Sequence, residues 1–330
     1  MIYKLLNILF SSFLSFFYRD QIARLFGFLE NFGKPFSYEN QAKKILDQLN
    51  SNETPIYIDV GARRGVNSRH WSYRDYLEFH LFEPDRTESE FLSQYYDFVH
   101  SCGLSDATYS SELNILEGVG GSYTSNNMYA ENLYGDEFSE KIGITGKKNQ
   151  VVKKEKINIK KLSEFSFSKN IIYLKIDVQG EESKILKGIE GTFRPAMICV
   201  EASSILNKVG NSSIKEILQW AESQNYYLLG AKFQDTQLSD KFGEFDYAIQ
   251  GDYFFIDKNF EKDVEIAKLA CSMLLILSMP LLASKIYSYT DNCLKLNTFE
   301  KFLQPQYSSY LKKHKFNNAH DLRAEGIDKK

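Results

Sequence analysis

Residues 56–65 have the sequence IYIDVGARRG, which predicts a β-strand that runs straight into a glycine-containing turn. Apolar and aromatic residues precede Asp59, and a segment compatible with a helix follows from Val66. Gly61 and Gly65 let the backbone turn tightly and can bring main-chain N–H groups close to a ligand. Their G-x-x-x-G spacing differs from the G-x-G-x-x-G spacing of a dinucleotide site. The segment therefore predicts a strand, a ligand-binding turn and a helix.

A second predicted strand ends at Glu83, about twenty residues after the first turn. A carboxylate can accept hydrogen bonds from both hydroxyls of a ribose, so this spacing predicts a cofactor that contains a nucleoside. Residues 103–106, GLSD, follow the next strand, where backbone groups could border an adenine. An acid at a strand end also occurs as a helix N-cap or in a turn. That alternative stays open for Glu83 and Asp106.

Predicted strands and helices alternate along most of the chain. We expect helices at 39–49, within 67–77, and at 87–95, 181–188 and 213–223, and strands at 56–60, 79–82, 98–102, 171–176, 197–200, 226–229 and 253–256. This order predicts an α/β fold with a parallel sheet, helices on both faces and an antiparallel pair of strands at one edge. Ligands bind beyond the carboxyl ends of such strands. Acids stand at those ends at Glu83, Asp177 and Glu201.

The composition is that of an ordinary globular protein, with 330 residues of which 43% are hydrophobic. A net charge of −3 argues against a general nucleic-acid binder, which would normally be basic. The four cysteines show neither a C-x-x-C motif nor metal-ligand spacing. We therefore expect a cytoplasmic protein without a cysteine-based metal site.

Two apolar segments lie outside the predicted sheet. Residues 2–17 form an amphipathic stripe, and residues 269–283 are fifteen mostly apolar residues, fewer than the roughly 20 that span a bilayer. We expect both to pack on the protein or on an oligomer partner, with peripheral contact at the inner face of the membrane as the alternative. The predicted division is a helical extension at 1–51, an α/β domain at 52–258 and a helical extension at 259–330.

Seven motifs occur in a fixed order over residues 55–205. They are IDVGAxxG at 58–65, FEPD at 82–85, GLSD at 103–106, the glycine-rich loop at 118–124, LKIDVQGEE at 174–182, ILKG at 185–188 and VE at 200–201. In this order they resemble the FkbM family of S-adenosylmethionine-dependent methyltransferases. That family usually has Glu where this chain has Gln179, so one carboxylate near the expected active site is missing.

The resemblance implies a class I methyltransferase fold, which is a Rossmann-like seven-stranded sheet with one antiparallel strand. It implies S-adenosylmethionine as the cofactor. By motif position, Asp59, Gly61 and Gly65 would hold the methionine end of the cofactor, Glu83 would bind the ribose, and Leu104 and Ser105 would border the adenine.

Members of the family mostly methylate hydroxyl groups, so the resemblance implies O-methylation of a glycan or another small-molecule acceptor. An alcohol is a poor nucleophile while protonated, and a general base beside it should contribute about 10²–10⁴-fold. Asp177 is the first candidate for this base, and Glu182 and Glu201 follow it. Asp177 and Glu201 could also ligate a hard cation, but two carboxylates are too few to predict one.

Two other functions stay open. A nucleotide-dependent oxidoreductase could use a similar sheet, but the glycine spacing at 61–65 and the lack of a recognisable second catalytic domain disfavour it. A non-catalytic module that binds S-adenosylmethionine is the other alternative, and Gln179 is the feature that suggests it. The sequence does not indicate an oligomeric state.

Overall fold

The computed structural model describes residues 39–49, 53–116, 123–124, 151–167, 170–178, 180–189, 191, 193–203, 213–233, 237–239, 246–248, 250–279, 282–283, 285–287 and 289–290. The predicted amphipathic helix in residues 2–17 lies outside these ranges, and so does Gln179.

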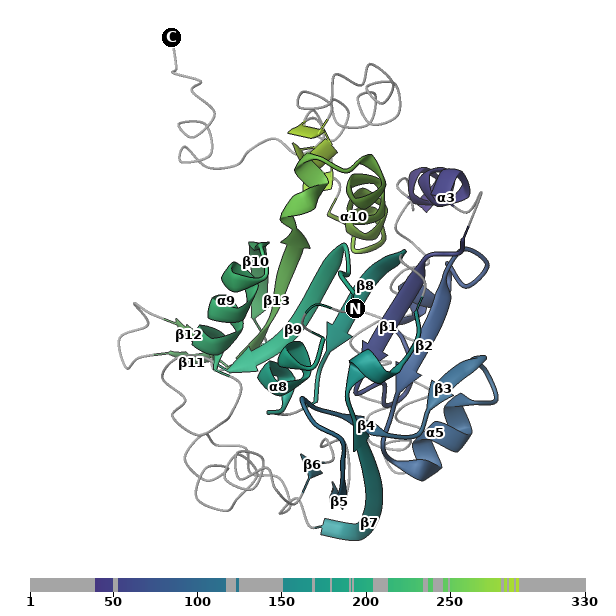
Figure 1. Ribbon diagram of the computed structural model, residues 1–330, viewed down its shortest axis with the longest axis vertical. Helices are drawn as coiled ribbons and strands as arrows, with labels where there is room; N and C mark the ends of the chain where they lie inside the picture. Colours follow the sequence, from purple (N-terminus) through teal and green to yellow (C-terminus); the bar gives the residue numbers. More distant parts are fainter. Residues whose placement is uncertain are drawn as a thin grey trace, which may run out of the picture.

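A seven-stranded sheet forms the centre of the fold (Figure 1). In spatial order its strands are β10 (Tyr226–Phe233), β13 (Gln250–Asp257), β9 (Met197–Ser203), β8 (Ile171–Ile176), β1 (Ile56–Val60), β2 (Glu78–Phe82) and β3 (Phe98–His100). β13 is antiparallel to both of its neighbours, and the other neighbouring pairs are parallel. This arrangement confirms the predicted α/β sheet with one antiparallel strand.

Helices cover both faces of this sheet. They are α3 (Glu39–Leu49), α4 (Ser68–Trp71), α5 (Arg86–Leu92), α8 (Glu182–Lys187), α9 (Ile214–Ser223) and α10 (Val264–Ile276), with 3₁₀ turns η1 (Leu162–Glu164) and η2 (Lys258–Glu261). α3 and α10 contact each other at the top of Figure 1 and share a core with Tyr57 and Tyr173. α8 and α9 share a second core with Ile58 and Leu174. β1 is buried along its whole length because both of its faces are covered.

Two smaller sheets accompany the central one. The first has the order β4 (Gly103–Leu104), β7 (Val151–Lys160), β5 (Tyr109–Leu116) and β6 (Tyr123–Thr124). The second consists of β11 (Gln237–Ser239) and β12 (Asp246–Ala248). β4 is important for the site because it carries Leu104 away from the central sheet.

Two predicted elements occupy only part of their predicted ranges. The helix predicted within 67–77 is α4, and hydrogen-bonded turns follow it. They place Tyr73 and Leu77 in the core beneath α3 before the chain enters β2. The strand predicted at 98–102 ends at His100, where the Cys102 N–H donates to the His100 carbonyl at 2.9 Å. The following residues pair with β7 instead.

The first part of the apolar segment 269–283 packs in the hydrophobic core. α10 contains its first eight residues, and all of these are buried. They share a core with α3 and with Tyr173 of β8, so packing within the chain accounts for their hydrophobicity. Within the described part of the chain, no helix is both long and apolar enough to cross a bilayer.

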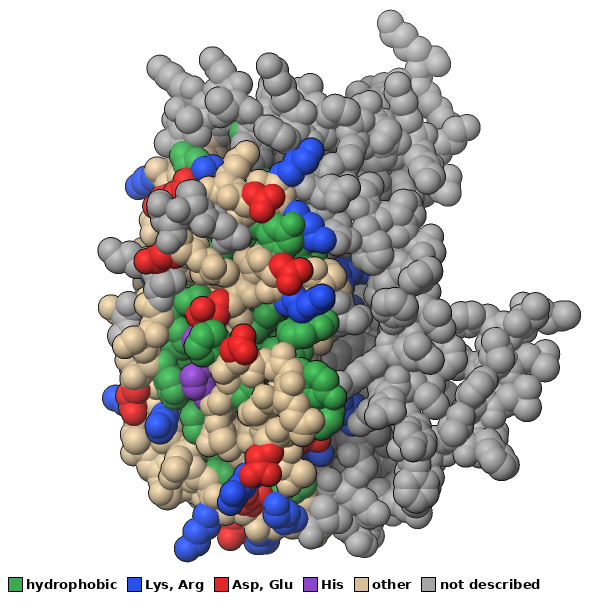
Figure 2. Space-filling model, turned by 90° about the vertical axis from the view of Figure 1, so that its right-hand side faces the viewer, with side chains coloured by type: hydrophobic (Ala, Val, Ile, Leu, Met, Phe, Trp, Pro, Cys, Tyr) green, Lys and Arg blue, Asp and Glu red, His purple; other side chains and the backbone are tan. Residues whose placement is uncertain are grey.

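The edge of the sheet at β3 exposes aromatic side chains. This side of the molecule faces the viewer in Figure 2, where hydrophobic and histidine side chains lie between charged ones. Phe98 is 41% exposed and stacks on His80 with 4.6 Å between ring centroids. Phe91 and Tyr95 are also exposed and contact each other.

Candidate active site

The carboxyl ends of β1 and β8 bring Asp59, Lys175 and Asp177 together. Asp59 lies opposite Lys175 in the parallel pairing of the two strands. Because side chains alternate along a strand, both point to the face that carries Tyr57 and Tyr173. Lys175 Nζ lies 3.1 Å from Asp177 Oδ2 and 3.6 Å from Asp59 Oδ1. The site therefore contains one ammonium group between two carboxylates.

Burial and charge distinguish the two carboxylates. The Asp59 side chain is buried, and this burial raises its pKa, while Lys175 opposes the shift. About a third of the Asp177 side chain (31%) is exposed, so a ligand can reach it. Burial lowers the pKa of Lys175, but the negative charges of Asp59 and Asp177 together raise it by more than burial lowers it. The pKa of Lys175 is therefore above its ordinary value. Lys175 therefore stays charged and offsets the negative charge of its neighbours.

Glu201 extends this group to the next strand and holds a proton. It lies opposite Asp252 where β9 pairs with β13. Burial first, and then the neighbouring Asp177 carboxylate, raise the pKa of Glu201 to about 9. At neutral pH Glu201 is therefore protonated, and its O–H donates a hydrogen bond to Asp177. Of the three carboxyl groups that the sequence nominates for the general base, Glu201 therefore already carries a proton at neutral pH.

We expect the stability of the Glu201→Gln variant to increase relative to that of the wild type as the pH rises. The pKa of Glu201 in the folded protein, about 9, lies above its ordinary value of 4.5. The folded protein thus keeps a proton that the unfolded chain releases, so stability falls as pH rises through this window. Gln keeps an N–H donor toward Asp177 and does not titrate. Thermal unfolding at pH 5, 7 and 9 measures the difference, and a difference that does not change with pH would contradict the assignment.

The turn after β1 depends on a close approach at Gly61. A Cβ atom built there would lie 1.9 Å from the Asp177 carbonyl oxygen, and Gly61 has φ +80°. Both facts require glycine. The Gly61 N–H donates to the Phe82 carbonyl, and the Gly65 N–H donates to the Ala62 carbonyl. The turn itself therefore uses these two N–H groups, and the expectation that Gly61 and Gly65 hold the methionine end of a cofactor stays a prediction.

Glu83 lies buried at the end of β2. Its Oε1 accepts the Asp85 N–H at 2.8 Å, and its side chain is buried. Burial raises the pKa of Glu83 to about 7, against lowering contributions from the Asp85 N–H and Arg63. The helix N-cap considered for Glu83 is instead Asp85, whose side chain accepts the Thr87 and Glu88 N–H groups of α5.

Leu104 and Ser105 are buried beside this strand end. The preceding residue, Gly103, lies close to Pro84, which follows Glu83. A Cβ atom built on Gly103 would be 3.9 Å from the Pro84 side chain. The Ser105 N–H donates to the Lys160 carbonyl, and its hydroxyl donates to Asp106 Oδ1 at 3.3 Å. The structure thus places the GLSD motif next to the FEPD motif.

Glu182 stands apart from the other acids in its bonding. Its carboxylate accepts the Val178 N–H at 3.2 Å and the Gly180 N–H at 3.0 Å. It therefore holds the turn that follows Asp177, and its side chain is buried. Among the described residues, no group of three or more His, Cys, Asp or Glu side chains could hold a metal ion.

The family model of the methyltransferase FkbM domain matches residues 59–228, just over half of the chain. This chain belongs to the FkbM methyltransferase family. It is an S-adenosylmethionine-dependent methyltransferase, and the sheet described above is its class I methyltransferase fold. Each strand-end acid of the site, Asp59, Glu83, Asp177 and Glu201, lies inside the matched region. No curated protein matches the chain.

Solved methyltransferase structures show distant likeness to this FkbM methyltransferase. One is a 1,6-didemethyltoxoflavin-N1-methyltransferase from Burkholderia thailandensis with bound S-adenosylhomocysteine, at 9% identity and a TM-score of 0.31, covering 77% of this chain and 89% of that chain. Another is a TehB-like methyltransferase from Corynebacterium glutamicum, at 11% identity and a TM-score of 0.31, covering 72% and 97%. The family match, and not these likenesses, decides the assignment.

The residues of the FkbM methyltransferase fit its cofactor. Glu83 places a buried carboxyl group, which can accept from hydroxyl donors, where the family motif puts the ribose. Asp59 Oδ1 is buried and, among the described residues, has no hydrogen-bond partner within 3.5 Å. The Lys175 ammonium group lies 3.6 Å from this oxygen, beyond hydrogen-bond distance, so the oxygen can still accept from the ammonium group of the cofactor. Both acids can accept from donors that S-adenosylmethionine carries, which are the ammonium group of its methionine part and the hydroxyl groups of its ribose.

Two further residues lie near the methyltransferase site, and the sequence motifs above do not include them. His70 belongs to α4, and its Nδ1 lies 2.9 Å from the Tyr57 hydroxyl. Burial, and then Arg69 and Lys175, lower the pKa of His70 to about 3, so the ring is neutral. The other is Asp252, which faces Glu201. Asp252 lies on the same face of β13 as the buried residues Phe254 and Ile256. An acid within such an apolar pattern is the sequence signal that could have identified it.

Proposed function

We propose that this enzyme transfers the methyl group of S-adenosylmethionine to a hydroxyl oxygen of a glycan or related small molecule. One observation carries the proposal: a partly exposed carboxylate, Asp177, at the carboxyl end of β8, fixed by Lys175 on one side and by protonated Glu201 on the other. A carboxylate held in this way can accept the proton of an acceptor hydroxyl. The acceptor class itself rests on the resemblance to the family.

The cofactor would lie along the ends of β1 and β2. Asp59 and the turn formed by Gly61 and Gly65 would hold its methionine end, and Glu83 would bind the ribose hydroxyls. Leu104 and Ser105 would border the adenine. The support is their burial and proximity: Gly61 packs on the Asp177 carbonyl, and Gly103 lies beside Pro84.

The cofactor supplies a methyl group already activated by a positively charged sulfur, so alignment of the acceptor provides much of the acceleration. Asp177 would orient the acceptor hydroxyl and take its proton at a carboxylate oxygen as the oxygen–carbon bond forms and the sulfur–carbon bond of the cofactor breaks, which leaves S-adenosylhomocysteine as the second product. Lys175 offsets the charge of Asp177 and fixes its direction. Glu201 keeps its proton and donates to Asp177, so in this proposal it positions the base and does not replace it.

We expect Glu83→Gln to weaken S-adenosylmethionine binding about 10- to 100-fold, because a charged acceptor of two hydroxyls is lost. Binding of the wild type should strengthen from pH 6 to pH 8, since the pKa of Glu83 is about 7 and the ionised form accepts both donors. Calorimetric titration of S-adenosylmethionine at both pH values measures this. The Gln variant should lose the pH dependence, and an equal pH dependence in both proteins would contradict the role.

A non-catalytic module that binds S-adenosylmethionine is the second candidate, and Gln179 favours it. Methyl transfer to a panel of glycans, followed as release of S-adenosylhomocysteine, separates the two. Turnover by the wild type that Asp177→Asn loses supports the enzyme. Turnover that appears only after Gln179→Glu supports the module. Absence of S-adenosylmethionine binding by the folded protein would remove both.

We also propose that residues 2–17 bring this cytoplasmic enzyme to the inner membrane face, where a lipid-linked acceptor would lie. The support is the apolar stripe of this segment, with polar residues opposite. Sedimentation with anionic vesicles should pull down the full chain and leave the chain lacking residues 2–17 in solution. Equal sedimentation of the two proteins would contradict the proposal.

A further inference from the structure

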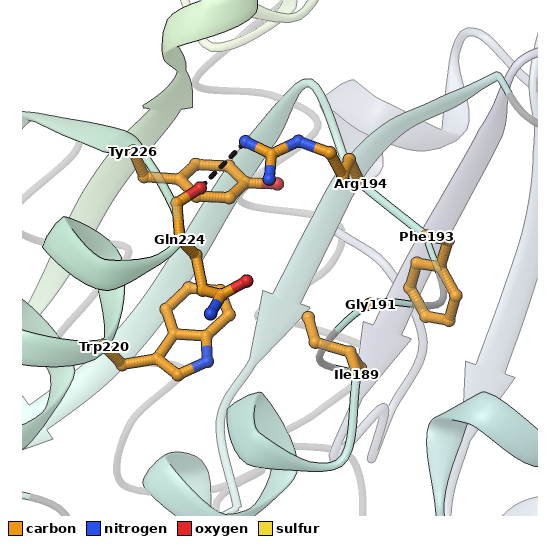
Figure 3. Close-up of a pocket in the computed structure, with 7 residues that line it drawn as sticks. All are labelled: Ile189, Gly191, Phe193, Arg194, Trp220, Gln224 and Tyr226. Atoms are coloured by element: carbon orange, nitrogen blue, oxygen red, sulfur yellow. Dashed lines mark hydrogen bonds between the residues drawn. The ribbon is translucent and has the colours of Figure 1, made fainter.

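A cavity of about 250 Å³ lies at the end of the sheet opposite the acids of the active site (Figure 3). It is lined by Ile189, Gly191, Phe193, Arg194, Trp220, Gln224 and Tyr226. These residues come from the segment between α8 and β9, the end of α9 and the first residue of β10. Asp177 and Glu201 stand beyond or near the carboxyl ends of their strands, whereas this cavity meets the amino ends of β9 and β10. It is therefore separate from the methyl-transfer site.

An unpartnered donor points into the cavity. Trp220 is 7% exposed, and its Nε1–H is buried without a hydrogen-bond partner among the residues described. Figure 3 shows this nitrogen on the side of the indole that faces Ile189, across the cavity. A buried N–H without a partner is unfavourable, so an acceptor oxygen placed in the cavity would recover a lost hydrogen bond.

The cavity carries no unbalanced charge. Arg194 Nε and Nη2 donate to the two carboxylate oxygens of fully buried Asp257, at 3.0 and 2.7 Å. Nη2 also donates to the Gln224 carbonyl at 2.8 Å, and the guanidinium lies 5.1 Å from the centre of the Tyr226 ring. This bidentate pair neutralises Arg194 and holds it rigidly. The cavity therefore suits an uncharged ligand better than an anion.

The remaining walls define the ligand further. Ile189 and Phe193 form an apolar side opposite Trp220, and the Gln224 amide points into the gap between them (Figure 3). The volume is below the roughly 300–1,000 Å³ of pockets for drug-sized ligands. The cavity thus has room for a small group with an acceptor oxygen beside an apolar carbon.

We propose that this cavity binds a small uncharged ligand through an acyl carbonyl oxygen, of the kind carried by the acetamido group of an N-acetylated sugar. The carbonyl oxygen accepts the Trp220 Nε1–H, the acetyl methyl packs on Ile189 and Phe193, and the amide N–H donates to the Gln224 side-chain oxygen. This site holds a ligand apart from the reacting groups, so its occupancy does not require Asp177.

The two tryptophans of the chain, Trp71 and Trp220, make this testable by NMR. The ¹⁵N-labelled full chain gives two indole N–H resonances, which Trp71→Phe and Trp220→Phe assign. The methyl glycoside of N-acetylglucosamine is then titrated, with methyl glucoside as the matched ligand that lacks the acetamido group. We expect a saturable shift of the Trp220 resonance alone, and at least tenfold weaker binding of methyl glucoside.

Affinity measurements on variants complete the test. By calorimetry, Trp220→Phe should bind the N-acetylated glycoside at least tenfold more weakly, whereas Trp71→Phe and Asp177→Asn should bind it as the wild type does. If Trp220→Phe does not fold, Gln224→Ala takes its place with the same expected loss. A Trp220 resonance that does not move, equal affinity for the two glycosides, or wild-type affinity in the folded variant would overturn the proposal. Loss of methyl transfer in Asp177→Asn with this binding intact separates it from the proposed function.

Discussion

Asp177→Asn is expected to lower kcat about 10²–10⁴-fold and to leave S-adenosylmethionine binding nearly unchanged. The substitution keeps the size of the side chain and the contact with Lys175 through the amide oxygen, but removes the oxygen that takes the acceptor proton. Asp177 is the carboxylate of the group that solvent reaches, whereas Asp59 is buried and Glu201 holds its own proton. Single-turnover methyl transfer with an identified acceptor measures the chemical step directly.

The matched control for this prediction is Asp97→Asn, because Asp97 is an exposed acid far from the strand ends that form the site. It should retain wild-type turnover. A kcat of Asp177→Asn within threefold of the wild type, at equal cofactor occupancy, would show that another group takes the proton. The base role of Asp177 would then be wrong.

Lys175→Met is expected to lower the free energy of unfolding by about 3–5 kcal/mol. Methionine fills a similar volume but leaves Asp59 and Asp177 without the ammonium group that lies 3.6 and 3.1 Å away. Most of the cost comes from Asp59, whose side chain is only 4% exposed. Urea unfolding at pH 7 measures the loss.

The double variant Lys175→Met with Asp59→Asn should recover part of this stability, since the uncompensated buried charge is removed. Lys153→Met is the matched control, because Lys153 is half-exposed and pairs with Glu155 on β7. It should change stability by less than about 1 kcal/mol. If Lys175→Met also lowered the free energy of unfolding by less than about 1 kcal/mol, the ammonium group of Lys175 would not be needed to stabilise Asp59 and Asp177.

Much of the fold follows from local sequence signals. β1 and β8 have the predicted bounds, because each is a short apolar run rich in Ile between polar turns, as expected for a strand buried on both faces of a covered sheet. α3 also has the predicted bounds, because its apolar residues Ala42, Ile45, Leu46 and Leu49 recur at helical spacing. The placement of acids at strand ends is also predictable. Parallel strands put their carboxyl ends on one side, so Asp59 and Asp177 had to meet once β1 and β8 were neighbours.

The chemistry of the site was less predictable, because it depends on contacts between distant segments. The proton on Glu201 results from burial together with Asp177, and both need the assembled sheet. The use of the Gly61 N–H depends on the Phe82 carbonyl of the neighbouring strand. The turn-holding role of Glu182 is local, but nothing in its residue type distinguishes an acceptor of N–H groups from a catalytic base.

The contact between α3 and α10 has a consequence for how the protein is made. Both helices cover the sheet face that bears Tyr57 and Tyr173, yet α10 is synthesised more than 200 residues after α3. During synthesis, α10 cannot cover this apolar face until residue 276 has left the ribosome. Until then the face is exposed to solvent, and the nascent chain needs protection from aggregation. For the same reason, a fragment cut to residues 59–228 would lack both helices, so recombinant versions of this enzyme should keep at least residues 39–276.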